Sequence, residues 1–428
     1  MRKVFFLLIL TLGCLSFRAA GQEDTLRCTY TPYPFPEIRD TPAPRGYKPF
    51  YISSYNRHGS RYMGKESEVS CILDALEAAR EANALTAEGS ALLKDMRSFA
   101  ALSEGMYGQL APRGERELSA LGARTARRFK EVFKGGTRTE VNGVSSTANR
   151  CVVSMANYLT ALKDACPKMN IHYTTGERHF RYISNAWGIS RVRAVHAKAL
   201  DRHIRSRFDY PSLAERLFTD GGKAAGAVTE WTSFCMYLYY CAADTKCLDS
   251  DLDLFRYLTP DQILTLRNQA DIVRYSANCL CLGTAAMRMD MVTPSMHEIR
   301  DKCAQALRPG STLAATFRFG HDTSLMALFS YLGLEGYTLE LEPAQVPGRW
   351  HSWELMPMGS NLQMVFYGKK KGQGDVLVKF LLNEEEKAIP ELGEGPYYKW
   401  SDVCRYLDAR EQRFAAGAKR ATSSSGTR

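Results

Sequence analysis

Hydrophobic and polar positions repeat along the first third of the chain with two different periods, which predict strands and helices in turn. The aromatic and β-branched residues of FYISSY, 50–55, favour a strand. Apolar residues then recur at helical spacing. The helices expected from this spacing lie at 66–85, about 87–102 and 118–133. VNGVSST, 141–147, is a short strand candidate, and it leads into a helix entered at about Arg150.

The second half of the chain shows a different pattern. Residues 177 to about 300 carry several helical repeats and few strand signals, which indicates an inserted helical domain. A strand is then expected at 311–319, followed by a helix at 323–332 that ends at Gly333. Two further strands are expected at 361–368 and 376–383.

Strands that alternate with helices predict an α/β fold: an open, mostly parallel sheet with flanking helices, plus a smaller inserted α-helical cap. The length of 428 residues also exceeds what one simple core needs. The expected division is a signal peptide at 1–21, the first part of the α/β core at 22–176, the cap at 177–300, the second part of the core at 301–405, and a basic disordered tail at 406–428.

The N-terminus has the features of an export signal. Arg2 and Lys3 precede the apolar run 4–12, and small residues follow, with cleavage expected near Gln22. The run is too short for a transmembrane helix, so we expect no transmembrane segment and a periplasmic or secreted protein. A lipid anchor at Cys14 is the less favoured alternative, because no leucine stands three residues before this cysteine.

Charge and composition limit the classes of molecule that this protein is expected to bind. Loss of the three basic residues of the signal peptide lowers the formal charge from +10 to +7, which suits polyanionic partners. The chain has no dense run of Lys and Arg interleaved with aromatics, so we expect no nucleic acid as a partner. The stretch 177–223 has ten basic and five acidic residues. It is either a solvated helical surface or a basic wall over a binding pocket. Nothing in the sequence indicates the oligomeric state.

Twelve cysteines in an exported chain favour disulfides, and removal of Cys14 leaves an odd number. The clustered cysteines Cys235, Cys241 and Cys247 have no CxxC spacing and no nearby histidine. Structural disulfides or buried thiols are therefore favoured over a metal site, and we expect no metal and no cofactor.

Three loops share one layout, in which a strand is followed by polar residues and then a helix. The first loop holds Arg57, His58 and Arg61, the second holds Arg150, and the third, FRFGHDTS, holds His321 and Asp322. In an open α/β sheet, ligands bind beyond the carboxyl ends of the strands, at the N-termini of the following helices. Convergence of these loops would surround one point with arginines and histidines. Because guanidinium groups match phosphate oxygens in pairs, we expect a phosphate there.

The same residues suit phosphoryl transfer. A neutral His58 can attack phosphorus, flanking arginines favour its neutral form, and Asp322 can protonate the leaving oxygen. Each residue also has an ordinary interpretation: Arg150 as a solvated or salt-bridged arginine, His321 as a helix-start residue, Asp322 as an N-cap. The combination at three strand–helix junctions favours the functional interpretation.

These motifs resemble those of the histidine acid phosphatases, branch two of the histidine phosphatase superfamily. That family has R-H-G-x-R-x-P near its start and H-D or H-A-E near its end. This chain has RHGSRYM at 57–63, with methionine for the proline, and GHDT at 320–323. SSTANRCVVS is similar to the segment that holds the family's third arginine. The layout is most similar to the multiple inositol polyphosphate phosphatases and bacterial phytases, although those phosphatases usually have His-Ala-Glu at the second motif.

The resemblance implies a secreted phosphomonoesterase that acts on inositol polyphosphates through a phosphohistidine. It implies His58 as the nucleophile, Asp322 as the proton donor, and phosphate binding by Arg57, Arg61, Arg150 and His321. The expected partner is a small polyanionic phosphate ester. The alternatives are a broad-specificity acid phosphatase that acts on simple esters and, less favoured, a non-catalytic polyanion-binding protein.

Overall fold

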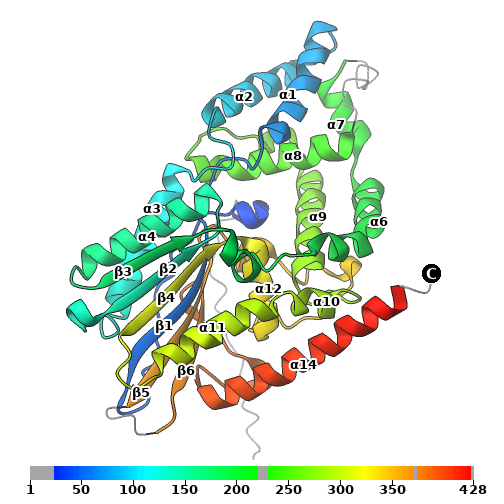
Figure 1. Ribbon diagram of the computed structural model, residues 1–428. Coiled ribbons are helices and arrows are strands. Elements are labelled where there is room, and N and C mark those ends of the chain that lie inside the picture. Colours follow the sequence, from blue (N-terminus) through cyan, green and yellow to red (C-terminus); the bar gives the residue numbers. More distant parts are fainter. Residues whose placement is uncertain (1–23, 220–229, 370–373, 426–428) are drawn as a thin grey trace, which may run out of the picture.

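The computed structural model describes residues 24–219, 230–369 and 374–425. Its central element is an eight-stranded sheet in the order β3-β2-β4-β1-β5-β6-β7, with β8 paired to β6 (Figure 1). The strands are β1 Tyr47–Arg57, β2 Glu140–Ser145, β3 Asn170–Thr175, β4 Leu313–Gly320, β5 Asn361–Lys369, β6 Leu377–Leu382, β7 Glu385–Glu386 and β8 Tyr397–Lys399.

The sheet has a parallel half and an antiparallel half. Strands β3, β2, β4 and β1 run parallel to their neighbours. From the β1–β5 pair onward the pairing is antiparallel. Crossover helices connect the parallel strands, as the alternation of strands and helices predicts. The expected α/β class is confirmed.

Helices cover both faces of the sheet, and the pleat of β1 shows how. Ile52 packs into a core with helices α3 Pro112–Arg128 and α4 Asn149–Ala165. Its neighbours Tyr51 and Tyr55 point to the opposite face. There they join a core built with α11 Thr293–Ala306 and α12 Asp322–Leu332. The sheet is therefore buried on both sides.

The tail expected to be disordered is instead helical. Helix α14 runs from Trp400 to Ser425 and lies along the edge of the molecule (Figure 1). Val403, Leu407 and Phe414 are buried in the same core as α12. Their spacing of four and seven residues places them on one helical face, so the helix packs through an apolar stripe. The polar, basic composition of the tail conceals this stripe.

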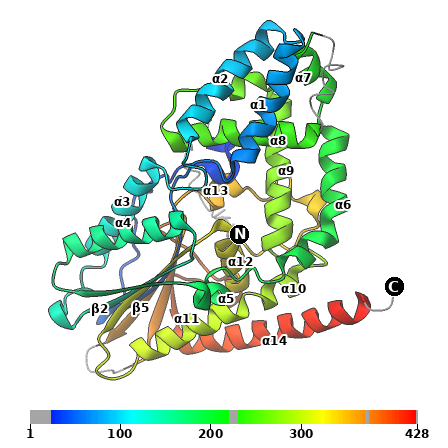
Figure 2. The same cartoon turned by 45° about the horizontal axis from the view of Figure 1, so that its top comes forward.

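A helical part stands above the carboxyl ends of the parallel strands (Figure 2). Residues 177–300 contribute α5 Phe180–Ile183, α6 Ile189–Arg207, α7 Tyr210–Leu217, α8 Trp231–Asp244, α9 Pro260–Asn278, α10 Ala285–Asp290 and α11. The packing does not follow the expected division, however. Helices α1 Glu66–Glu81 and α2 Ala87–Ser103, assigned to the α/β core, share a core with α7 and α8, whereas α11 packs against the sheet. The apolar faces of α1 and α2 do not reveal which partner covers them.

The eleven cysteines of the described residues are all free thiols, and eight of them are buried. Disulfides and buried thiols are the two alternatives expected for these cysteines, and the structure has buried thiols. Within the same residues, no group of three or more His, Cys, Asp or Glu side chains could hold a metal ion. No helix there is long and apolar enough to span a membrane. The expected signal peptide, Cys14 included, lies outside the described residues.

Candidate active site

The three strand–loop–helix junctions meet at one edge of the parallel half of the sheet. Arg57, the last residue of β1, pairs with Gly320, the last residue of β4. Ser145, the last residue of β2, pairs with Phe319 on the other side of β4. Because the three strands are adjacent and in register, their following loops open onto the same space. The convergence expected from the sequence is therefore present in the fold.

The loop after β1 is held in place by unusually close packing against α3. A Cβ on Gly59 would lie 2.6 Å from the carbonyl oxygen of Gly114, closer than side chains approach such an atom. The buried carboxylate of Glu117 accepts hydrogen bonds from the backbone N–H and the hydroxyl of Ser60, at 2.7 and 2.8 Å. Glycine at both contact positions and one buried glutamate thus fix the backbone that carries His58.

His58 lies in a buried position with one ring nitrogen engaged. Its Nδ1 is 2.9 Å from the carbonyl oxygen of Gly59. A carbonyl can only accept, so Nδ1 carries the proton and Nε2 keeps its lone pair. Burial, followed by the positive charges of Arg150 and Arg57, holds the pKa of His58 well below its usual value. His58 is therefore a neutral imidazole with a free Nε2 lone pair, which is the form a nucleophile requires.

His321 is also neutral, through a different set of contacts. Arg150 Nη2 lies 3.3 Å from His321 Nδ1, and a guanidinium can only donate, so this nitrogen accepts. The proton then sits on Nε2, which lies 3.4 Å from the hydroxyl of Ser146. Burial and the charge of Arg150 lower the pKa of His321 to about 4. The ring meets that of His58 edge-on, with 5.7 Å between ring centres.

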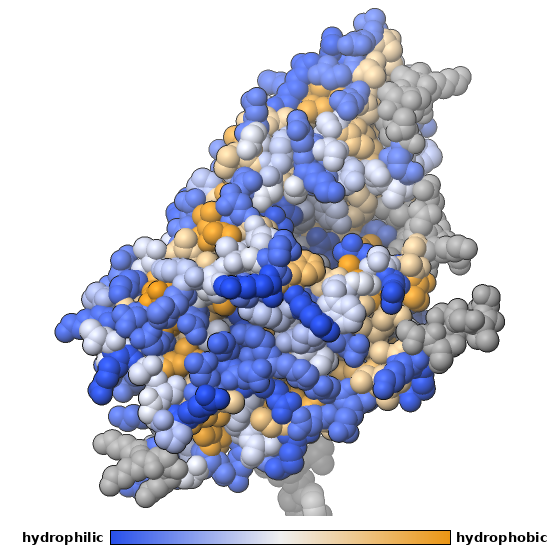
Figure 3. Space-filling model, viewed as in Figure 1, coloured by the Kyte–Doolittle hydropathy of each residue, from blue (hydrophilic) through white to orange (hydrophobic). Residues whose placement is uncertain are grey.

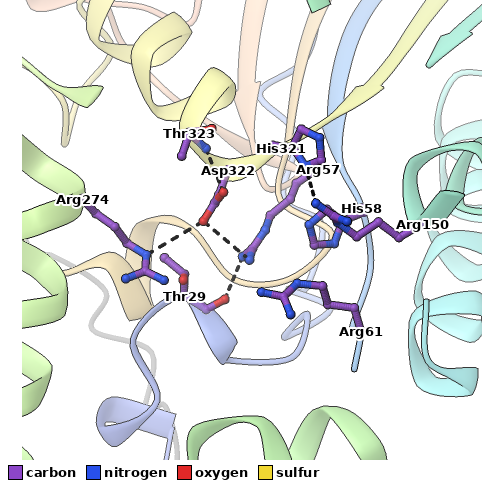
Figure 4. Close-up of a pocket in the computed structure, with 9 residues that line it drawn as sticks. All are labelled: Thr29, Arg57, His58, Arg61, Arg150, Arg274, His321, Asp322 and Thr323. Carbon is purple, nitrogen blue, oxygen red and sulfur yellow. Dashed lines mark hydrogen bonds and ion pairs between the residues drawn. The ribbon is translucent and has the colours of Figure 1, made fainter. Parts of the chain in front are cut away.

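Asp322 lies between two arginines. Its Oδ2 is 3.7 Å from Arg57 Nη2 and 3.9 Å from Arg274 Nε (Figure 4). Burial raises its pKa, but the two guanidinium groups outweigh that effect and bring the pKa to about 2. Arg57 itself is buried and donates to the carbonyl oxygens of Thr29 and Met356, at 2.7 and 2.9 Å. Between these two guanidinium groups Asp322 is therefore a carboxylate.

These side chains line one cavity of about 240 Å³. The space-filling view shows a hollow between the helical part and the sheet, with hydrophilic residues inside it (Figure 3). All six residues expected from the sequence line the cavity, and three further residues join them. The full lining is Thr29, Arg57, His58, Arg61, Arg150, Arg274, His321, Asp322 and Thr323 (Figure 4).

Of the three residues that the sequence did not indicate, Thr29 and Arg274 come from outside the three junctions, whereas Thr323 follows Asp322 in the third junction. Thr29 belongs to the short helix η2 Cys28–Tyr30, in a region that sequence patterns mark only as a lead-in. Arg274 extends from α9, where it faces the cavity opposite His58 (Figure 4). The only local signal for Arg274 is Arg267, seven residues earlier on the same side of the helix. That spacing alone does not distinguish a ligand-binding face from a solvated one.

The charge balance of the cavity suits an anion. Four guanidinium groups face one carboxylate, both histidines are neutral, and α12 directs its N-terminus toward the same space. None of the described residues in the stretch 177–223 lines the cavity. Its exposed arginines include Arg191 and Arg193 on α6, and α6 packs against α9, which itself faces the cavity through Arg274. The positive charge at the cavity thus comes from the core loops and α9.

Comparison with known proteins gives likenesses in structure only. No protein-family model and no curated protein sequence matches the chain. Among solved structures, a Bifidobacterium longum multiple inositol polyphosphate phosphatase in complex with inositol hexasulfate superposes with a TM-score of 0.75 at 18% identity, over 90% of this chain and 98% of that one.

Two phytases are also similar. The D. castellii phytase has a TM-score of 0.68 at 13% identity, over 90% of its own length and 94% of this chain. The Hafnia alvei phytase in complex with tartrate has a TM-score of 0.54 at 15% identity, over 86% of this chain and 98% of that one. The resemblance expected from the motifs is therefore confirmed at the level of the fold: this chain has the α/β fold with a helical part that these phosphatases share.

Proposed function

We propose that the protein is a phosphomonoesterase that removes phosphate from inositol polyphosphates through a phosphohistidine on His58. The observation that carries this proposal is the neutral His58, with its free Nε2 lone pair, inside a cavity lined by four arginines. A protein that only binds anions has no need for a buried, deprotonated imidazole at the centre of its site. The fold shared with an inositol polyphosphate phosphatase and two phytases supports the substrate class.

The reaction has two steps. Arg57, Arg61 and Arg150 hold the phosphate oxygens, and His58 Nε2 attacks phosphorus while the bond to the ester oxygen breaks. Protonated Asp322 gives its proton to the leaving alkoxide. Asp322, now a carboxylate, then takes a proton from a water molecule that attacks the phosphohistidine. Inorganic phosphate leaves, and His58 is restored as a neutral imidazole.

The first step requires a protonated Asp322, yet Arg57 and Arg274 lower its pKa to about 2. A bound phosphate resolves this conflict, because its negative charge offsets the field of Arg57 and Arg274. Binding of the substrate thus raises the pKa of Asp322 and allows this residue to carry the proton that it donates. This coupling fits an enzyme that works in mildly acidic surroundings, and we propose export to the periplasm or beyond as its setting.

Broad activity on simple phosphate esters is the second candidate. One observation favours it: none of the described residues of the basic stretch 177–223 lines the cavity, so only Arg274 is left to meet a second phosphate. A time course with inositol hexakisphosphate, with products resolved by isomer, is compared with turnover of a small aryl phosphate to separate the two candidates. Ordered removal of phosphates supports an inositol polyphosphate phosphatase, whereas equal turnover of any monoester supports a broad-specificity phosphatase.

The test of the mechanism is His58→Ala. We expect turnover of inositol hexakisphosphate and of an aryl phosphate to disappear, while the melting temperature and the binding of inorganic phosphate persist. Wild-type enzyme quenched in an alkaline denaturant should carry substrate phosphate on a histidine, since phosphohistidine survives base and not acid. A matched control is His297→Ala, which removes an exposed histidine on α11 that bonds Glu411. Turnover by the His58 variant would contradict the proposal.

A further inference from the structure

Two of the cavity arginines are joined through a pair of stacked tyrosines. The guanidinium carbon of Arg61 lies 5.2 Å from the ring centre of Tyr30. The Tyr30 ring stacks on that of Tyr240, with 5.6 Å between centres and 29° between planes. The guanidinium carbon of Arg274 lies 5.7 Å from the Tyr240 ring centre. Tyr30 and Tyr240, called the tyrosine pair below, thus form a continuous contact from Arg61 to Arg274.

The four groups come from four separate elements. Arg61 belongs to the loop after β1, Tyr30 to η2, Tyr240 to α8 and Arg274 to α9. The two arginines reach the cavity from different sides, and Thr29 lies between them (Figure 4). The tyrosine pair therefore links the α/β core to the helical part at the cavity itself.

The helix η2 is tied to the end of α8, so that the two tyrosines keep a fixed relation. Tyr239 donates its hydroxyl hydrogen to the carbonyl of Leu26 at 2.8 Å. Arg27 donates to the carbonyls of Ala242 and Ala243 at the last turn of α8, at 3.1 and 3.0 Å. These last-turn carbonyls have no partner within their own helix. The stack is thus held by backbone contacts besides its own rings.

An aromatic partner suits an arginine that must also bind a phosphate. A carboxylate would hold the guanidinium but would cancel the charge on which anion binding depends. A neutral ring face holds it by cation–π attraction and leaves the charge in place. Burial raises the pKa of Tyr30, so that its phenol stays neutral at any working pH. Its hydroxyl accepts from Arg61 Nη2 at 3.2 Å, which adds direction to the contact.

Resting on the proposed function, we propose that Tyr240 is a positioning residue that fixes the distance between Arg61 and Arg274. In the proposed function Arg61 binds the phosphate, while Arg274, together with the stronger effect of Arg57, lowers the pKa of Asp322. A constant distance between them ties the place of the bound phosphate to the place where the leaving oxygen is protonated. Tyr240 does not line the cavity, and it acts through Arg274, which it contacts.

The test uses the full chain with Tyr240→Leu, Tyr240→Phe and, as a matched control, Tyr237→Leu. Tyr237 lies on the same helix, is partly buried, and packs into the core of the helical part. For Tyr240→Leu we expect inorganic phosphate to bind about two- to thirtyfold more weakly, the range that one lost cation–π contact implies. Tyr240→Phe keeps the ring face but loses the hydroxyl's hydrogen bond with Arg274, so its phosphate affinity should fall between those of the wild type and Tyr240→Leu. Tyr237→Leu should bind phosphate normally, even if it melts earlier.

The pH profile separates positioning from mere stability. When Arg274 is no longer held, Asp322 is less acidic, so for an alkyl phosphate the fall of kcat with rising pH should occur at higher pH in Tyr240→Leu. In a protein that already carries Arg274→Ala, Tyr240→Leu should not shift further the pH at which kcat falls. A lower but unshifted profile, or equal phosphate binding by Tyr240→Leu and Tyr237→Leu, would overturn the proposal.

Two precautions keep the outcomes distinct. If Tyr240→Leu does not fold, Tyr240→Met removes the ring with an unbranched side chain that adapts to the same space. Phosphate binding is measured by calorimetry without turnover. A wild type that binds phosphate and hydrolyses no ester would therefore refute the proposed function and still test the tyrosine pair.

Discussion

Asp322 and Arg57 form an ion pair across the cavity, with 3.7 Å between Oδ2 and Nη2, and in the proposed reaction one is the proton donor and the other binds the phosphate. This pairing and the nearby Arg274 keep Asp322 ionised, at a pKa of about 2. Its role as a proton donor thus depends on what enters the cavity. The first two predictions concern this dependence.

Asp322→Asn should slow poor leaving groups far more than good ones. An alkoxide needs a proton as it departs, whereas a nitrophenolate hardly does. We expect kcat for an alkyl phosphate to fall by about 100-fold to 10,000-fold, the usual contribution of general acid catalysis, and kcat for nitrophenyl phosphate to fall much less. Steady-state kinetics on both esters checks this. An equal loss on both would mean that Asp322 shapes the site without donating a proton.

Anion binding should take up protons on the acidic side. Asp322 is ionised, His321 has a pKa of about 4, and the pKa of His58 is well below its usual value. A bound dianion favours the protonated form of all three, so their pKa values rise and protons are absorbed near pH 5. At pH 8 the uptake should vanish, because the raised values still lie below the ambient pH.

Sulfate is the suitable probe, since it stays a dianion over this range and contributes no proton of its own. Calorimetry in buffers of different ionisation enthalpy measures the uptake, which we expect to be a substantial fraction of one proton at pH 5. Asp322→Asn should take up less. Proton release on sulfate binding, or no exchange at pH 5, would contradict the assignment.

The strand–loop–helix junctions could be predicted from the sequence because their signals are local. Arg57, His58, Arg150 and Asp322 each follow a strand pattern and precede a helix pattern. Adjacent parallel strands then bring these junctions together without any further information. The sequence therefore predicts the six residues of the three junctions, and the structure places all six at one cavity.

What the sequence did not predict depends on long-range packing. Arg274 reaches the cavity only because α9 crosses above the sheet, and no local pattern states where a helix will cross. The helices α1 and α2 have ordinary apolar stripes that fit either the sheet or α8. The strand β3 was missed because its six residues are exposed or half-buried, so no apolar alternation marks it.

Gly59→Ala should damage both stability and turnover. The added methyl would lie 2.6 Å from the carbonyl oxygen of Gly114 and from Leu118 Cδ2, so α3 or the loop must move. We expect a loss of about 1–3 kcal/mol in unfolding free energy, as for other overpacked sites. We also expect at least a tenfold lower kcat, because His58 moves with the loop.

Gly64→Ala is the matched control, five residues further on. Its added methyl would meet only the carboxylate of Glu68, at 3.2 Å, and that side chain can turn aside. Denaturant unfolding and kinetics on nitrophenyl phosphate compare the two variants. A Gly59 variant as stable and active as the Gly64 variant would show that the close approach to α3 is unimportant.

The last prediction concerns which positive charges serve a polyphosphorylated substrate. The sequence suggests the basic stretch 177–223, whereas the structure places Arg274 on the cavity and the exposed Arg191 and Arg193 on α6, which packs against α9. At physiological ionic strength, attraction between exposed charges is screened over about 8 Å, so this exposed pair, which does not line the cavity, should matter little. A direct charge-assisted contact to a second phosphate is worth about 1.5–3 kcal/mol. Arg274→Ala should therefore raise KM for inositol hexakisphosphate by about tenfold to a hundredfold.

Removal of two charges from α6, by Arg191→Ala with Arg193→Ala, should raise the same KM by less than about threefold, and added salt should erase the difference. Both variants should change KM for nitrophenyl phosphate less, because in the proposed mechanism Arg57, Arg61 and Arg150 also hold its single phosphate. Measurements of kcat/KM for both substrates across a salt series compare the three proteins. If KM rises more in the α6 variant than in Arg274→Ala, although the α6 pair does not line the cavity, the long-range field of the helical part governs binding and the basic stretch is a true substrate surface.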